Sequence, residues 1–152
     1  MRRASATAFA AALLTSVLLW RIYVQRAGRI LGEAVTRAAH PATIGRSAAD
    51  THLVMVIGVV ATAIGYELVN EHPTGHNEVG WLAMILGGPA LFLAGESLFI
   101  RRMTGTTNVT RLAAAGLLIS LAPLGGETSA LLLSLIVASL LPALAVWELR
   151  GS

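Results

Sequence analysis

The sequence predicts an all-α polytopic membrane bundle of about five transmembrane helices, and three observations support this prediction. Hydrophobic residues make up 55% of the 152 residues and charged residues only 12%, whereas typical soluble domains carry about 25% charged residues. The chain falls into five apolar runs, and a transmembrane helix needs roughly 20 predominantly apolar residues. Arginine is confined to alternate connections between the runs, which is the pattern of a membrane protein whose basic loops face the cytoplasm.

The first run, residues 6–23, follows Arg2 and Arg3 and ends near Trp20 and Tyr23. A basic start before an apolar run resembles a signal peptide, but no A-x-A cleavage site follows it. We therefore predict an uncleaved span with aromatic residues at the membrane interface.

Residues 24–50 are predicted to form a long cytoplasmic loop, because this is the only long polar stretch of the chain. Its middle, residues 28–39, favours a short helix on the membrane surface, and His40-Pro41 is expected to end it, since proline disfavours helix in the preceding residue. Five arginines lie at the end of the first run and in the connection that follows it: Arg21, Arg26, Arg29, Arg37 and Arg46.

The second span is predicted over residues 53–69, with Asp50 or Thr51 as its cap, and the third over residues 79–100. A turn-rich outer loop separates them. Within the third run, Gly88 and Pro89 are a candidate helix break, because proline removes one helical hydrogen bond. Either the break is a passive kink or it builds a substrate site, as broken helices do in transporters.

The fourth and fifth spans are predicted over residues 109–124 and 129–147, and residues 1–152 are expected to form one transmembrane domain. The fourth run is short, so the alternative is a tilted, kinked or re-entrant segment. Five spans with basic loops inside the cell place the N-terminus outside and the C-terminus in the cytoplasm.

Small residues recur at helical spacing and predict close contacts between helices. Compact packing within one bundle is the first interpretation, and the face of a homodimer is the second. The second and third spans carry the clearest examples: Gly58, Ala61 and Gly65, and Gly80, Gly87 and Gly95.

A series of short motifs resembles a known family. The motifs are Leu19-Trp20-Arg21-Ile22-Tyr23, His52-Leu53-Val54, Glu71-His72-Pro73, residues 86–95 with Leu98-Phe99 and Arg101-Arg102, and Arg111-Leu112-Ala113-Ala114. In this order they resemble the C-terminal part of the bacterial low temperature requirement protein A family. The resemblance covers nearly the whole chain and implies a multi-pass protein of the bacterial inner membrane whose biochemical activity is not established.

Glu96 is the residue that bears most directly on function, because carboxylates inside spans are costly and mark a pathway or a pair. It lies one turn inside the cytoplasmic end of the third span. We predict a polar site at this level from Asp50, His52 and Glu96 with the loop residues Arg101 or Arg102. Two interpretations stay open: Glu96 serves assembly by pairing or snorkelling, or it belongs to a transport pathway.

Other chemistries find little support in the sequence. It contains no nucleophile elbow, phosphate-binding loop or dinucleotide fingerprint, so we expect neither an enzyme nor a cofactor. The acidic and histidine residues of the outer side have poor spacing for a metal site, so a solvated acidic loop is the first interpretation and a metal site is the alternative: Glu67, Glu71, His72, His76, Glu78 and Glu127. The arginines are not interleaved with aromatic residues, which argues against nucleic acid as a partner.

The sequence therefore predicts a helical packing or accessory module in the lipid bilayer. Its expected partner is a second copy of the chain or the family's N-terminal membrane spans on another chain. The alternative is a proton- or solute-coupled transporter that uses Glu96 and His52.

Overall fold

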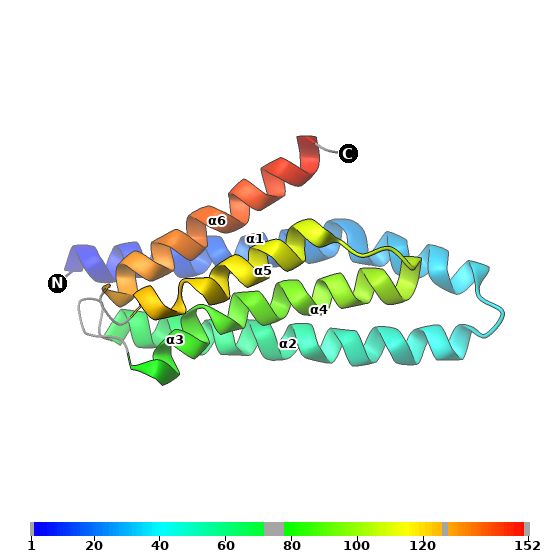
Figure 1. Ribbon diagram of the computed structural model, residues 1–152, viewed down its shortest axis with the longest axis horizontal. Coiled ribbons are helices and arrows are strands. Elements are labelled where there is room, and N and C mark those ends of the chain that lie inside the picture. The colour runs from blue at the N-terminus through cyan, green and yellow to red at the C-terminus, as the bar shows by residue number, and fades with distance from the viewer. Residues whose placement is uncertain (1, 72–77, 126–127, 151–152) are drawn as a thin grey trace.

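The computed structural model describes residues 2–71, 78–125 and 128–150, and the regular secondary structure of these residues is helical, without a strand among them (Figure 1). The order is α1 (Arg2–Arg37), α2 (Pro41–Glu71), α3 (Val79–Ile85), α4 (Gly87–Thr104), α5 (Val109–Ser120), a 3-10 turn (Ala122–Leu124) and α6 (Ala130–Arg150). The all-α prediction is confirmed.

The predicted loop over residues 24–50 is replaced by two long helices that form a hairpin. Helix α1 continues to Arg37 and α2 begins at Pro41, so only residues 38–40 connect them. The expected break at His40-Pro41 is confirmed, because the fixed backbone angle of proline suits the first position of a helix. The expected cap at Asp50 or Thr51 is wrong: both lie inside α2.

The third apolar run is divided into two helices at Leu86. The amide of Leu86 still donates to the carbonyl of Leu82 at 3.0 Å, and the amide of Ala90 donates to the carbonyl of Leu86 at 3.2 Å. Pro89 lies in the first turn of α4, where a missing N–H is tolerated. Gly88 and Pro89 therefore lie at the start of α4, a few residues after the break itself.

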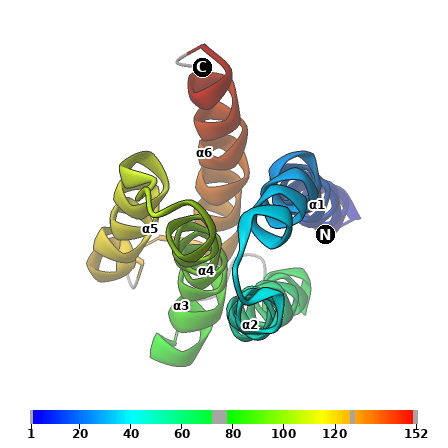
Figure 2. The ribbon, with the colours of Figure 1, turned by 90° about the vertical axis from the view of Figure 1, so that its right-hand side faces the viewer.

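Helix α4 lies in the middle of the bundle, as the end-on view shows (Figure 2). Its most extensive contact is with α2, and it also packs against α5 and α1. The apolar core surrounds α4. Leu93 of α4 and Leu86 just before it are almost fully buried, and the same core contains Leu118 of α5 and Leu133 of α6.

Glycine brings the backbones of α2 and α4 together. A Cβ added at Gly58 would lie 2.6 Å from the amide nitrogen of Phe92, and one added at Gly88 would lie 2.5 Å from that of Thr62. A Cβ added at Gly65 of α2 would lie 2.9 Å from the amide nitrogen of Ile85 in α3. Such contacts hold only where no side chain intervenes, so these glycines are part of the packing within one chain.

The glycine stripe expected in the third run is only partly correct. A Cβ at Gly95 would lie 3.0 Å from the Met55 side chain, but Gly80 and Gly87 face open space. The closely packed positions are Gly88 and Gly95, seven residues apart, which places them on one face of α4.

Two helical segments among the described residues are long and apolar enough to cross a membrane: Pro41–Glu71 and Val79–Thr104. Val109–Leu124 and Ala130–Leu144 are shorter apolar segments. The break at Leu86 lies within the second of the long segments, so α3 and α4 together would make one crossing.

Candidate functional site

The candidate site is a buried ion pair between α4 and α5. The carboxylate oxygen Oε1 of Glu96 contacts the guanidinium nitrogen Nη1 of Arg111, and each side chain is only 2% exposed. Glu96 directly follows Gly95 in α4, and Arg111 lies in the first turn of α5. The pair therefore connects two helices that follow each other in the sequence.

The turn between the two helices determines where Arg111 points. Gly105 caps the C-terminal end of α4. Its φ of 74° is in the left-handed region, and its amide donates to the carbonyl of Arg101 at 2.9 Å. Glycine adopts this conformation without the steric cost that a side chain brings. The chain can thus reverse within residues 105–108 and bring α5 back along α4.

Asn108 then fixes the first turn of α5. Its side-chain oxygen Oδ1 accepts a hydrogen bond from the amide of Arg111 at 3.2 Å, as an N-cap residue does. Its carbonyl oxygen accepts a hydrogen bond from the hydroxyl of Ser97 at 3.3 Å. Because Ser97 follows Glu96 on α4, these contacts hold Arg111 opposite the carboxylate.

The burial of both charges determines what the pair can do. Moving an ion out of water costs several kcal/mol, so each charge depends on its partner. The arrangement is suited to holding α4 and α5 together, and it leaves Glu96 almost no exposed surface.

The other residues of the predicted polar site do not share this environment. Asp50 and His52 of α2 are exposed, and so are Arg101 and Arg102 in the last turn of α4. The partner that sequence analysis did not single out is Arg111. A signal was present, since Arg111 lies three residues after the helix-capping residue Asn108 and therefore within the next helix rather than in the loop.

His52 lines a separate cavity between α1 and α2. The cavity has a volume of about 280 Å³, and most of its lining is apolar, including Trp20, Met55 and Phe92. Glu96 is absent from that lining. The lining of this cavity therefore does not bring His52 and Glu96 together.

The outer acidic and histidine residues do not gather into a metal site within residues 2–71, 78–125 and 128–150. No group of three or more His, Cys, Asp or Glu side chains there could hold a metal ion. His72, His76 and Glu127 lie outside the described residues.

Comparison with known proteins gives one family. The model of the family described as bacterial low temperature requirement A protein matches residues 2–146. An uncharacterized protein of Rhizobium meliloti (strain 1021) is 30% identical over 92 residues, which are 60% of this chain and 22% of that relative. The chain thus matches less than a quarter of the relative's length. No solved structure matches.

Proposed function

The chain belongs to the bacterial low temperature requirement A family, and on this basis we propose that it is an integral protein of the bacterial inner membrane. We propose that it acts as a helical packing or accessory module and not as an enzyme. Two long apolar helical segments support the membrane assignment. The closed Glu96–Arg111 pair is the observation that carries the functional part of the proposal.

The proposed topology has five spans, with α3 and α4 forming one of them, the N-terminus outside and the C-terminus in the cytoplasm. The turn between α1 and α2 and the turn between α4 and α5 lie at the same end of the bundle (Figure 1). Exposed arginines lie near these turns: Arg37, Arg46, Arg101 and Arg102. A concentration of arginine at one end is the feature that directs that end to the cytoplasm.

The pair supports a role in assembly because of its closure. A transport pathway through Glu96 would need polar surroundings and access for water or solute. Instead, Glu96 and Arg111 are both 2% exposed and contact each other. A closed pair of this kind can specify which helix faces meet, a role that buried polar and ionic groups have in some proteins.

Further membrane helices are the proposed partners. The match accounts for only 22% of the Rhizobium meliloti relative, so in that protein the corresponding region accompanies a much longer chain. Large apolar side chains on α2 are also exposed, among them Leu53, Ile57 and Val60. Such a surface is suited to lipid or to other membrane helices, including those of a second copy.

The test is the mass of the protein purified in a mild detergent, measured by light scattering with the detergent contribution subtracted. The proposal predicts a dimer, or a complex with a defined membrane protein that cross-links to the exposed face of α2. A stable monomer that cross-links to no protein in the native membrane would contradict it.

The alternative, a proton- or solute-coupled transporter using Glu96 and His52, makes a separate prediction. A pH-dependent flux into liposomes would be lost in Glu96→Gln while the exposed control Glu67→Gln retained it. The proposed packing role predicts no flux that depends on Glu96. The separation of His52 from the Glu96 environment argues for the packing role.

A further inference from the structure

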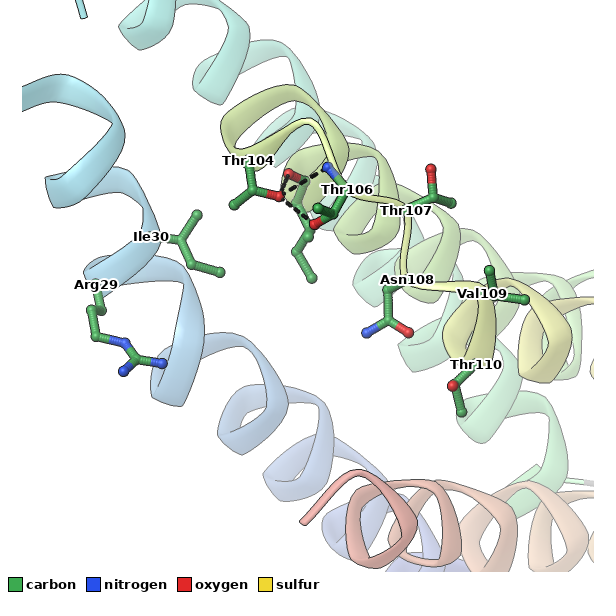
Figure 3. A pocket seen from close by; sticks show the side chains of 9 residues that line it. Arg29, Ile30, Thr104, Thr106, Thr107, Asn108, Val109 and Thr110 are labelled. Atoms are coloured by element: carbon green, nitrogen blue, oxygen red, sulfur yellow. Dashed lines mark hydrogen bonds between the residues drawn. The ribbon is translucent and has the colours of Figure 1, made fainter. Parts of the chain in front are cut away.

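A cavity at the basic end of the bundle offers a binding site that the packing role does not use. It has a volume of about 470 Å³ and lies between α1 and the connection from α4 to α5 (Figure 3). Arg29 and Ile30 line it from α1, while Thr104, Thr106 and Asn108 lie across from them. Of the residues that line it, none carries a carboxylate.

Arg29 supplies a cation that is available for a ligand. Neither of the ion pairs Glu33–Arg37 and Glu96–Arg111 includes Arg29. Glu33 lies one turn further along α1, but its Oε2 contacts Nη2 of Arg37 at 3.4 Å. The Arg29 guanidinium, which neither of these ion pairs includes, can donate two parallel hydrogen bonds to a phosphate.

The opposite wall is polar and partly ordered by its own hydrogen bonds. The Thr104 hydroxyl donates to the carbonyl of Ile100 at 2.8 Å and lies 2.7 Å from the Thr106 hydroxyl. The amide of Thr106 donates to the Thr104 hydroxyl at 3.2 Å. These contacts hold the wall of the cavity in place, and the hydroxyl of Thr110 at the start of α5 adds a further polar group to the lining.

The cavity lies close to the level expected for the headgroup layer of a bilayer. Arg29 lies six residues beyond Tyr23, which is about 9 Å along a helix, and Thr104 lies four residues beyond Ile100, about 6 Å. The headgroup layer on each side of the hydrocarbon is about 5–8 Å thick. Ile30 and Ile100 also line the cavity, so apolar groups are present beside the polar ones.

We propose that this cavity binds the phosphate headgroup of an anionic phospholipid from the cytoplasmic leaflet, with Arg29 as the principal phosphate ligand. The proposal rests on the membrane location given above. Basic pockets between spans on this side of a membrane are suited to anionic headgroups. The apolar side chains of the same cavity favour a lipid over free phosphate, which has no acyl chain to place there.

The test measures dissociation constants by native mass spectrometry of the full chain in detergent. The probes are short-chain phosphatidylglycerol, short-chain phosphatidylcholine and inorganic phosphate. We expect phosphatidylglycerol to bind most tightly and Arg29→Gln to weaken it about tenfold or more, because a hydrogen-bonded charge contact is lost. Arg29→Lys should recover part of the loss, since lysine keeps the charge but not the bidentate geometry.

Arg46→Gln is the matched control, because Arg46 is an exposed arginine near the same end that does not line the cavity. Equal effects of Arg29→Gln and Arg46→Gln would overturn the site in favour of general surface charge. Inorganic phosphate binding as tightly as phosphatidylglycerol would overturn the lipid as the occupant.

Reconstitution into vesicles separates this inference from the proposed function. A chain that enters the bilayer without preferring phosphatidylglycerol would overturn the lipid site alone. A chain that does not enter the bilayer would overturn the membrane assignment and the lipid site together.

Discussion

The contact between α2 and α4 and the contact between α4 and α5 are specified in different ways. In the first, glycine lets two backbones approach, so that a Cβ on Gly88 would lie 2.5 Å from the amide nitrogen of Thr62. In the second, Glu96 and Arg111 form a buried ion pair beside the Ser97–Asn108 hydrogen bond. One contact depends on the absence of a side chain, and the other depends on two specific side chains.

The difference shows how helices can find their neighbours in a bilayer. Lipid provides no hydrophobic force that drives helices together, so van der Waals packing and polar contacts must specify each pair. The glycine contact tolerates no added volume on either backbone. The ion pair tolerates the loss of both charges better than the loss of one. Four sets of substitutions test this comparison, in order of expected effect.

The largest effect is expected from removing one member of the ion pair. Arg111→Leu leaves the Glu96 carboxylate buried without its partner and should lower the free energy of unfolding in detergent by about 3–5 kcal/mol. Glu96→Leu should be similarly harmful. The double variant Glu96→Leu/Arg111→Leu should be much closer to wild type, and additive losses would show that the two side chains do not act as a pair.

Two adjacent glycines offer a sharper test of the α2–α4 contact. Gly88→Ala should cost about 2–3 kcal/mol, because the added methyl group meets the backbone of Thr62 and overpacks the interface. Gly87→Ala should have no such cost, since a Cβ there meets nothing within 4 Å. Thermal unfolding of both variants measures the difference, and equal midpoints would contradict the close approach of α2 and α4.

A smaller effect is expected at the turn that positions Arg111. Asn108→Ala removes the side-chain cap of α5 and should cost about 1 kcal/mol. Asn108→Ser should retain most of the stability, because a serine hydroxyl can accept the same hydrogen bond. If chemical denaturation gives Asn108→Ala and Asn108→Ser the same free energy of unfolding, the side-chain cap contributes nothing to the position of α5.

The smallest effect is expected between α1 and α2, where the hydroxyls of Thr15 and Tyr66 lie 2.5 Å apart in a buried contact. Tyr66→Phe should cost about 0.6 kcal/mol, the average for side-chain hydrogen bonds between membrane helices. Thr15→Val should cost a similar amount, and the two substitutions together should cost little more than either. Independent losses in this double-mutant cycle would mean that the hydroxyls do not interact.

Much of the helical architecture could be predicted from the sequence, because apolar runs and proline act locally. The break at His40-Pro41 is one example. The extension of α1 to Arg37 could not be predicted in the same way, since polarity alone does not distinguish a loop from a helix that continues beyond the apolar run. The number of spans stays a prediction.

The candidate site was predicted only in part. The cost of burying a carboxylate identified Glu96, but its partner depended on how the chain reverses after α4. Gly105 and Asn108 determine that reversal, and it brings Arg111 to Glu96 while Arg101 and Arg102 remain exposed. Charge spacing along the sequence does not contain this information, because it arises from the geometry of the turn.

The most direct test of the account is infrared difference spectroscopy of the membrane-embedded protein between about pH 5 and about pH 9, a range that lies above the ordinary glutamate pKa of about 4.3. Wild type is compared with Glu96→Gln. The account predicts no protonated-carboxyl band that depends on Glu96, because its carboxylate is closed against the Arg111 guanidinium and both side chains are buried. A band that titrates within this range and vanishes in Glu96→Gln would reveal an acid that exchanges protons, and would contradict the packing role.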